Sequence, residues 1–390
     1  MQNQIPKTWR KVKLREIVKI NMGQSPSSKH YNEKGKGLPF YQGVTDFGEK
    51  CPSKSIYCSK PIKRSTRGEI LFSVRAPVGD VNIATEECCI GRGVASLAMK
   101  NGNNNFLYFF LSRYKEYFKR IAGGTTYESV NKSDLEETEL PIPPENEQKR
   151  IASILSAFDD KIEVNNKIAK TLEQMAQTIF KEWFVLPSVA LEKGGRLPKG
   201  WTLKKIKDLG KVVTGKTPST KNPANFGKDC PFVTIPDMLN TFILNTERYL
   251  SKRGIERMKN LLLPKGSVCV SCIATVGLVG ITTEESITNQ QINSIIPRKK
   301  EYTYFLYQFF KRNKRLLEAY GAGGSTTLII NKTQFENLDI LVADTPTIKK
   351  FHQLVNPMYE KILILSKENQ KLAMMRDLFL PKLMKGEIRV

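Results

Sequence analysis

The stretch that decides the fold is residues 151–183, IASILSAFDDKIEVNNKIAKTLEQMAQTIFKEW. Its apolar residues return in alternating steps of four and three, which is the heptad repeat of a helix that packs along another helix. A helix from about 147 to 184 would be roughly 55 to 60 Å long, longer than a small domain is wide. The seam consists of Ile151, Leu155, Phe158, Ile162, Asn165, Ala169, Leu172, Ala176, Ile179 and Trp183.

A second seam of the same kind lies near the end of the chain. Two such seams in one chain most simply pack on each other; the alternative is that each helix covers only its own domain. Proline suits the start of both helices, at Pro143-Pro144 and around Pro346, whereas Pro357 is expected to kink the second helix and Pro381 to end it. The second seam consists of Phe351, Val355, Met358, Ile362, Leu365, Asn369, Leu372, Met375, Phe379 and Leu383.

Asn165 and Asn369 interrupt these apolar seams. If the helices run antiparallel about a pseudo-two-fold, the two residues lie symmetrically about a midpoint near residues 167 and 367. We predict that their side chains approach each other and help to fix the register of the helices. The acidic cluster Asp159, Asp160 and Glu163 is interpreted as solvated charge on the exposed helix face, in preference to a metal site.

The seams belong to an internal repeat that covers the whole chain. The offset between the copies is 192 near the start, 198 from Gly68 onward and 200 from Gly123 to the end. We therefore predict a first domain at 1–144, a helix within 145–186, a second domain at 187–344 and a second helix within 345–390. The matched positions include Trp9 with Trp201, Gly23 with Gly215, Pro39-Phe40 with Pro231-Phe232, Gly68 with Gly266, and Asn131-Lys132 with Asn331-Lys332.

The sequence of each predicted domain is typical of a mixed α/β fold. Short strand-like runs lie around Val-Gly turns, and a helical stretch follows them before a Gly-Gly loop. The predicted fold is α+β: two similar mixed domains separated by two long antiparallel coiled-coil helices, related by a pseudo-two-fold. The predicted strands are 70–74, 81–84, 268–273 and 278–282, and the predicted helices are 106–121 and 302–320.

The chain carries a net charge of +24, and a polyanion is the commonest partner for so large an excess. The two predicted domains carry +9 and +11 of it, whereas the first helical region is near neutral. The alternative is a basic surface that only contacts solvent. No run is long and apolar enough for a membrane span, and seven scattered cysteines fit a reducing cytoplasm better than a disulfide framework.

Several catalytic and cofactor motifs are missing from the sequence. We find no Asn-Pro-Pro-Tyr-like tetrapeptide, no strand followed by GxGxxG and no GxxxxGK[ST] loop, so neither a bound cofactor nor ATP-driven translocation is expected. Only His30 and His352 are available for histidine chemistry. Cys269 and Cys272 have the spacing of half a zinc site, but they lie in an apolar run and are interpreted as small buried hydrophobes.

The combined motifs resemble a known family. Each domain ends in GG[ST]T with a downstream Asn-Lys, and in the first copy Leu140 to Pro144 with Gln148 leads into the long helix. This pattern is similar to the specificity subunit of type I restriction-modification systems. In the second copy Leu341-Val342-Ala343-Asp344 replaces the proline pair, and Ile348 replaces the glutamine.

The resemblance implies a non-catalytic protein whose two domains are target-recognition domains. Each would read one half of a bipartite site in double-stranded DNA. DNA methyltransferase (modification) subunits would dock on the scaffold, and restriction/translocase subunits would join them. Two other classes stay open: an enzyme with its own diverged nuclease or methyltransferase activity, and an RNA-binding or architectural protein.

The candidate DNA-binding residues are polar loop residues at matching places in the two copies. Positions where the copies differ, such as Arg75 against Ile273 and Arg92 against Gln290, are the better candidates for reading bases, because the two domains should read different half-sites. The alternative is that shared positions serve only loop geometry. The candidates are Gln24, Ser25, Ser28, Lys29, Gln42, Thr45, Arg75, Arg92, Thr125, Thr126 and Lys132 in the first copy, and Lys216, Thr217, Thr220, Lys221, Thr234, Thr275, Gln290, Ser325, Thr326 and Lys332 in the second.

Overall fold

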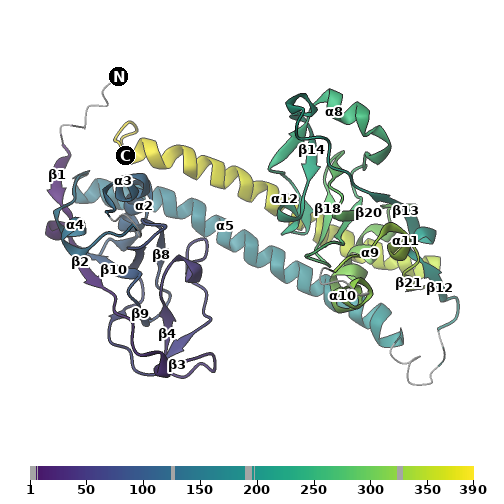
Figure 1. The fold of residues 1–390 in the computed structure, drawn as a ribbon, viewed down its shortest axis with the longest axis horizontal. Coiled ribbons are helices and arrows are strands. Elements are labelled where there is room, and N and C mark those ends of the chain that lie inside the picture. Colours follow the sequence, from purple (N-terminus) through teal and green to yellow (C-terminus); the bar gives the residue numbers. More distant parts are fainter. Residues whose placement is uncertain (1–5, 7, 124–127, 189–195, 197, 323–327) are drawn as a thin grey trace. The chain divides into compact units, whose positions relative to one another are not determined.

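The computed structural model describes residues 6, 8–123, 128–188, 196, 198–322 and 328–390. The chain forms two compact units, the first from residues 1–163 and 370–390 and the second from residues 164–369. Each unit contains one mixed α/β domain together with part of each long helix, α5 (Glu145–Phe180) and α12 (Thr345–Leu383) (Figure 1). The internal repeat read from the sequence is therefore also a structural repeat.

The domain of the first unit contains two main sheets. One is antiparallel, in the order β2-β10-β7-β8; the other, β3-β5-β4-β9-β6, includes a parallel pair between β4 and β9. Helices α2 and α3 add aromatic side chains to the core, where the rings of Phe72 and Phe118 lie 5.0 Å apart. The elements are β1 (Arg10–Lys13), α1 (Leu14–Ile17), β2 (Val18–Met22), β3 (Tyr31–Asn32), β4 (Leu38–Tyr41), β5 (Tyr57–Cys58), β6 (Arg64–Ser65), β7 (Ile70–Ser73), β8 (Val81–Ile83), β9 (Cys88–Ile90), β10 (Val94–Met99), α2 (Asn104–Arg113), α3 (Lys115–Ile121), α4 (Lys132–Glu137) and β11 (Glu139–Ile142).

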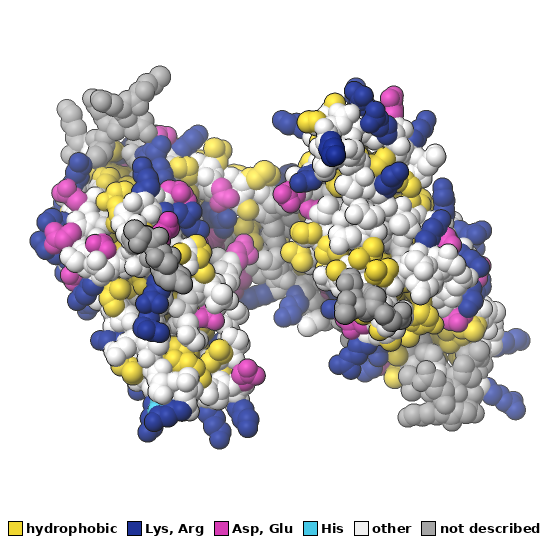
Figure 2. Space-filling model, viewed as in Figure 1, with side chains coloured by type: hydrophobic (Ala, Val, Ile, Leu, Met, Phe, Trp, Pro, Cys, Tyr) yellow, Lys and Arg dark blue, Asp and Glu magenta, His cyan; other side chains and the backbone are white. Residues whose placement is uncertain are grey.

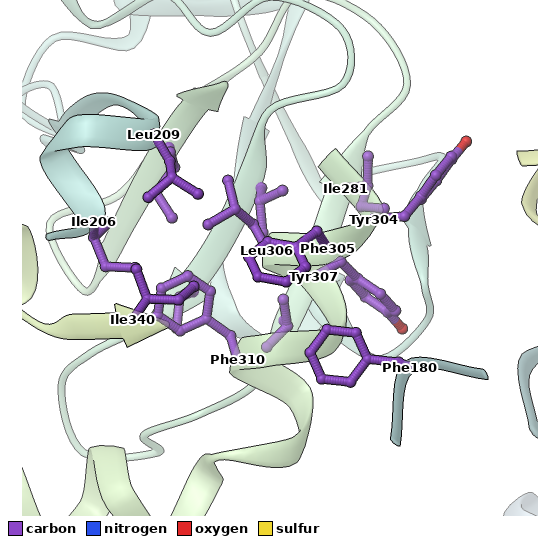
Figure 3. Close-up of a cluster of buried hydrophobic side chains, with 14 of the residues drawn as sticks. Phe180, Ile206, Leu209, Ile281, Tyr304, Phe305, Leu306, Tyr307, Phe310 and Ile340 are labelled. Atoms are coloured by element: carbon purple, nitrogen blue, oxygen red, sulfur yellow. The ribbon is translucent and has the colours of Figure 1, made fainter. Parts of the chain in front are cut away.

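The domain of the second unit repeats this plan and adds a short helix, α8. Its sheets have the orders β13-β20-β17-β18-β15 and β16-β14-β19. Phe180 of α5 lies beside the aromatic residues of α9 in the core, with its ring 5.7 Å from that of Phe305 (Figure 3). The elements are β12 (Thr202–Lys205), α7 (Ile206–Leu209), β13 (Gly210–Thr214), β14 (Phe226–Val233), β15 (Phe242–Ile243), β16 (Arg248–Leu250), α8 (Lys252–Arg257), β17 (Val268–Ser271), β18 (Val279–Thr282), β19 (Ile287–Thr288), β20 (Ile292–Pro297), α9 (Tyr302–Arg312), α10 (Lys314–Gly321), α11 (Lys332–Glu336) and β21 (Asp339–Val342).

The predicted strands are confirmed as β7, β8, β17 and β18. Each predicted domain helix is present but is divided into two, at Tyr114 in the first domain and at Asn313 in the second. The recurrence of Asn131-Lys132 as Asn331-Lys332 is explained by local structure, because each asparagine caps a short helix. Asn131 caps α4 by accepting a hydrogen bond from the backbone N–H of Asp134, and Asn331 caps α11 in the same way.

The long helices pack on each other along their seams, and they run antiparallel within each unit. In the second unit the ring of Phe180 lies 6.0 Å from that of Phe351, while Asn165, earlier in α5, meets Asn369, later in α12. In the first unit the ring of Phe158 stacks 6.1 Å from that of Phe379. Ile151 and Leu155 are buried in the core of the first domain, so α5 is both a seam helix and a core element.

The expected approach of the two seam asparagines is observed. Nδ2 of Asn165 donates to Oδ1 of Asn369 over 2.9 Å and to Oε2 of Glu368 over 2.9 Å. Nδ2 of Asn369 in turn donates to Oδ1 of Asn166 over 2.8 Å. A pairing shifted along the helices would place the buried amide of Asn165 against apolar residues, which is costly.

The expectation that Pro381 ends the second helix is wrong. Pro381 does not end α12, which continues through Pro357 and Pro381 to Leu383. Each proline removes one backbone hydrogen bond, at a cost of about 3 kcal/mol. The burial of Leu383 and Met384 in the core of the first domain stabilises this last turn.

Asp159 is not solvated charge on an exposed face, because it is buried with a side chain that is 5% exposed. Its Oδ1 accepts a hydrogen bond from Nη1 of Arg376 in α12 over 2.7 Å, and Nζ of Lys50 lies 3.2 Å from its Oδ2. The pKa of Tyr108 is raised to about 12, mainly by burial and secondly by the negative charge of Asp159. The domain therefore covers a helix face that the heptad pattern alone leaves open, whereas Asp160 and Glu163 are exposed.

Within the described residues, no helix combines the length and the apolar composition that crossing a bilayer requires.

Candidate nucleic-acid interface

Four loops of the first domain meet at one edge of its two sheets. Met22 at the end of β2 pairs with Ala95 near the start of β10, and Ser73 at the end of β7 pairs with Val94. Tyr41 at the end of β4 lies beside Ile90 at the end of β9 in a parallel pair. The loops that leave these strand ends therefore converge. We call residues 23–25, 42–43, 74–75 and 91–93 the first loop cluster.

Hydrogen bonds hold the first loop cluster together. The backbone N–H of Gln24 donates to the carbonyl of Ile90 over 3.0 Å, and that of Val74 donates to the carbonyl of Gly93 over 3.0 Å. The loops approach so closely that a Cβ on Gly93 would lie 2.2 Å from the carbonyl oxygen of Gln42. Glycine is needed there because any side chain would push the loops apart.

The second domain builds the same arrangement from matching strands. Thr214 at the end of β13 pairs with Asn293, Ser271 at the end of β17 pairs with Ile292, and Val233 at the end of β14 lies beside Thr288. The backbone N–H of Lys216 donates to the carbonyl of Thr288 over 3.0 Å, and that of Cys272 to the carbonyl of Gln291 over 2.7 Å. We call residues 215–217, 234, 272–275 and 289–291 the second loop cluster.

The two clusters share a backbone frame and differ in every candidate side chain. Most of these side chains are exposed; Ser25, Thr217, Thr234 and Ile273 are half-buried. The structure thus brings together candidates from four separate loops in each domain, on positions that match between the repeats. The matched positions are Gln24 with Lys216, Ser25 with Thr217, Gln42 with Thr234, Arg75 with Ile273, and Arg92 with Gln290.

Described residues that flank the two Gly-Gly loops bridge to residues of these clusters. In the first domain Ser129 pairs with both Arg75 and Gly123 in isolated bridges, and in the second domain Ile329 pairs with Ile273. The candidates Thr125, Thr126, Ser325 and Thr326 lie outside the described residues. Ser129, which follows the Gly-Gly loop of the first domain, therefore adjoins the candidate Arg75.

The remaining candidates, apart from Thr275, lie outside the two loop clusters. Ser28 and Lys29 belong to a short 3₁₀ turn before β3, and Thr45 to another after β4. Thr220 and Lys221 are exposed in the turn that precedes β14, and Thr275 is exposed at the end of its loop. Lys132 and Lys332 each pair with a glutamate one helical turn later, at 3.4 Å, so their charge is partly neutralised within their own helices.

Two aspartates that the sequence reasoning missed hold the cluster loops in shape. Oδ2 of Asp46 accepts the backbone N–H of Gln42 over 2.6 Å, and Oδ2 of Asp237 accepts that of Thr234 over 2.7 Å. The signal that could have found them is an aspartate three or four residues after a matched loop position, which is typical of a turn closed by a side chain.

Cys269 and Cys272 are buried hydrophobes, as interpreted from the sequence. They are 0% and 1% exposed, and burial raises the pKa of each thiol to about 12. Thiols with so high a pKa stay protonated near neutral pH and pack as small hydrophobic groups. The pair therefore contributes packing to the core of the second domain.

Comparisons with known proteins agree with this repeat. The family model for the type I restriction modification DNA specificity domain matches residues 6–174 and again residues 198–373. The HindI specificity subunit of Haemophilus influenzae is 34% identical over 351 residues, covering 73% of this chain and 76% of that protein. The MjaIX specificity subunit of Methanocaldococcus jannaschii is 28% identical and covers 99% of this chain and 95% of its own.

A solved structure has the same fold. The type I restriction-modification S subunit from M. genitalium superposes with a TM-score of 0.66 at 18% identity, covering 98% of this chain and 97% of that one. The two relatives above are named as specificity subunits, which gives no support to an intrinsic nuclease or methyltransferase activity. The chain belongs to the type I restriction-modification specificity family and carries that family's DNA specificity domain once in each of its two repeats.

Proposed function

We propose that each loop cluster reads one half of a split DNA sequence through the major groove. The observation that carries this proposal is that the two clusters have the same backbone frame and different side chains. Two domains that recognise two different half-sites require different polar side chains at the DNA. The same backbone scaffold can present both sets. The guanidinium of Arg92 can donate two hydrogen bonds to O6 and N7 of guanine. The amide of Gln290, at the matching position, can pair with N6 and N7 of adenine.

The positive charge of the domains supports the same function. Lys and Arg side chains are distributed over the surface of both domains, including the end of the first domain where β3 lies and the surface over α8 (Figure 2). Such groups neutralise phosphates and give DNA affinity that depends on salt but not on sequence. We assign the two target-recognition domains to residues 1–144 and 187–344.

We further propose that the paired helices, within residues 145–186 and 345–390, set the distance between the two target-recognition domains. Helix α5 alone has 36 residues, or about 54 Å of continuous helix. Two half-sites whose centres lie one DNA turn apart, about 34 to 36 Å, present the same face of the duplex. In this proposal the length of the helices sets the permitted gap between half-sites.

The chain supplies recognition in this scheme, and DNA methyltransferase subunits and restriction/translocase subunits assemble on it to perform the chemistry. We place this assembly in the cytoplasm. All seven cysteines are free thiols, six of them buried, which fits a reducing compartment.

The test is to sequence methylated bases in a host that makes this chain together with its methylation partner. The expected result is one split motif, with two short specified parts and a gap of fixed length. The matched control is a host that makes the methylation partner alone, in which the motif should be missing. A contiguous motif, or the same motif without this chain, would show that the proposal is wrong.

A further inference from the structure

The second loop cluster carries two apolar side chains where the first cluster carries polar ones. Ile273 and Ile329, which we call the isoleucine pair, face each other in an isolated antiparallel bridge, and Arg75 and Ser129 form the matching bridge of the first domain. Ile329 is 45% exposed and Ile273 is half-buried, so both side chains reach the surface. The second domain therefore presents an apolar surface at an edge that is polar in the first.

The side chains of the isoleucine pair lie close together on the same side of the bridge. The backbone N–H of Ala274 donates to the carbonyl of Leu328 over 3.0 Å, and that of Ile330 donates to the carbonyl of Cys272 over 2.9 Å. These hydrogen bonds are made by the neighbours of the bridged residues. In such a pair the Cα atoms are about 4.5 Å apart and the facing side chains approach most closely, so the two isoleucines form one continuous surface.

The backbone frame alone does not require the isoleucine pair. A cross-strand pair of β-branched residues stabilises a bridge, but the first domain makes the same bridge without one. There the backbone N–H of Ala76 donates to the carbonyl of Glu128 over 3.1 Å, and that of Val130 donates to the carbonyl of Val74 over 2.9 Å. The side chains at the bridge can therefore differ between the domains while the frame stays the same.

The isoleucine pair lies beside the loop that carries Gln290. The backbone N–H of Cys272, directly before Ile273, donates to the carbonyl of Gln291, directly after Gln290, over 2.7 Å. Gln290 is exposed. An amide that can pair with adenine and an apolar surface thus lie on two adjoining loops of the same cluster.

We propose that the isoleucine pair contacts the 5-methyl group of a thymine in the half-site that the second domain reads. The inference rests on the proposed reading of DNA by the loop clusters. Thymine is the base that presents an apolar group in the major groove. Gln290 is suited to adenine, and every adenine of a duplex is paired with a thymine, whose methyl group lies in the same groove.

The consequence is that the two half-sites are recognised by different chemistry. In the second domain the amide of Gln290 and the isoleucine pair recognise two separate groups of an A·T-containing step. Cytosine lacks the 5-methyl group, so the apolar contact also discriminates against a G·C pair at that place. In the first domain Arg75 and Ser129 occupy the matching bridge and offer hydrogen-bond donors instead.

The test uses the full chain in complex with its methylation partner, and duplexes in which each thymine of the split motif is replaced in turn by uracil. Uracil lacks only the 5-methyl group and keeps the base pair. We expect affinity to fall about fourfold at a thymine of the half-site that Gln290→Arg alters, because about 0.8 kcal/mol is lost with one buried methyl group. This scan of the parent complex requires no variant to fold.

The combined variant Ile273→Ser with Ile329→Ser should bind the thymine duplex and the uracil duplex equally. The matched control is Leu203→Ser, which removes a leucine that is 66% exposed in the separate sheet β12-β21 of the same unit. The control should keep the fourfold preference for thymine. Thermal unfolding of both variants checks that they remain folded.

Equal affinity of the parent complex for thymine and uracil throughout that half-site would overturn the inference. A thymine preference that survives in the folded isoleucine variant would do the same, as would a half-site that contains no A·T pair. If the variant loses its methylation partner and keeps the thymine preference, the isoleucine pair is a protein contact and the inference is wrong. A parent complex that prefers no split sequence would instead count against the proposed function.

Discussion

The backbone N–H of Arg92 donates a hydrogen bond to Oγ of Ser25 over 3.1 Å, and in the second domain Oγ1 of Thr217 donates to Oε1 of Gln290 at the matching positions. The same pair of positions is therefore in contact in both loop clusters. Ser25 holds the backbone of the loop that carries Arg92, whereas Thr217 holds the side chain of Gln290 itself. This support makes positions 92 and 290 the sharpest tests of base reading.

Arg92→Gln should change the preferred base at one position of one half-site. Because arginine pairs best with guanine and glutamine with adenine, we expect the parent base to lose about 1 to 3 kcal/mol of preference at that position. Competition binding over all single-base variants of the motif measures this. The other half-site should be unaffected, and Gln290→Arg should produce the reciprocal change there. Equal weakening on all sequences would assign Arg92 to a phosphate.

The double variant Asn165→Leu with Asn369→Leu should raise the urea midpoint of unfolding. Asn165 is fully buried and Asn369 is half-buried, and a polar residue in an apolar seam fixes the register at a cost in stability, so we expect a gain of about 1 kcal/mol or more. The helices should at the same time lose their unique register, so methylation should extend to motifs with other gap lengths. A double variant that keeps the single gap of the parent would show that the asparagines do not set the register.

Arg376→Met should destabilise the first unit by about 3 kcal/mol, because it leaves the buried carboxylate of Asp159 with Lys50 as its one remaining cation among the described residues. Asp159→Asn combined with Arg376→Met should recover part of this loss. The matched control is Asp160→Asn at the exposed neighbouring residue, for which we expect a change within about 0.5 kcal/mol. Urea unfolding followed by circular dichroism measures all three variants, and an effect of Arg376→Met no larger than that of Asp160→Asn would contradict the prediction.

Inserting one heptad into both helices should change the permitted gap between half-sites. Asn165 meets Asn369, so insertions between residues 166 and 167 and between residues 367 and 368 preserve the antiparallel pairing. Seven residues add about 10.5 Å, or roughly three base pairs of duplex. Sequencing of methylated motifs reads the gap directly. An insertion variant that folds and methylates with the original gap would refute the proposal that helix length sets the gap between half-sites.

Glu69 should make the first unit sensitive to acid. Burial raises the pKa of this carboxyl, but hydrogen bonds from Ser96, Ser65 and the backbone N–H of Thr66 outweigh burial and lower the pKa below its usual 4.5. The native state then binds this proton less readily than the unfolded state. The stabilisation is therefore present above about pH 4.5 and is lost as the pH falls through the lowered value.

The measurement is the urea midpoint of the parent and of Glu69→Gln between pH 7 and pH 3.5. The parent should be the more stable of the two at neutral pH, and the difference should shrink at the acid end. Glu33→Gln, at an exposed residue, is the matched control and should follow the parent curve. A constant difference between parent and Glu69→Gln over the whole range would contradict the assignment.

The repeat, the two seams and the strand runs could be read from the sequence because each depends on neighbours along the chain. A heptad stripe requires only that a helix turns every 3.6 residues, so Ile151, Leu155 and Phe351 are recognisable as buried positions without a partner in view. The pairing of Asn165 with Asn369 followed from the same periodicity, together with the symmetry of two copies. The cationic excess of the domains is a property of composition alone.

Other features depend on segments that are distant in sequence, and only the tertiary structure decided them. Asp159 is buried because Lys50 and Arg376 reach it from outside α5, and Pro381 stays helical because the core of the first domain holds the last turn of α12. The meeting of four loops at each cluster depends on strand pairs such as Tyr41 with Ile90. Periodicity within one segment carries no information about which other segment will cover it, because that choice is made by packing and hydrogen bonding across the whole domain.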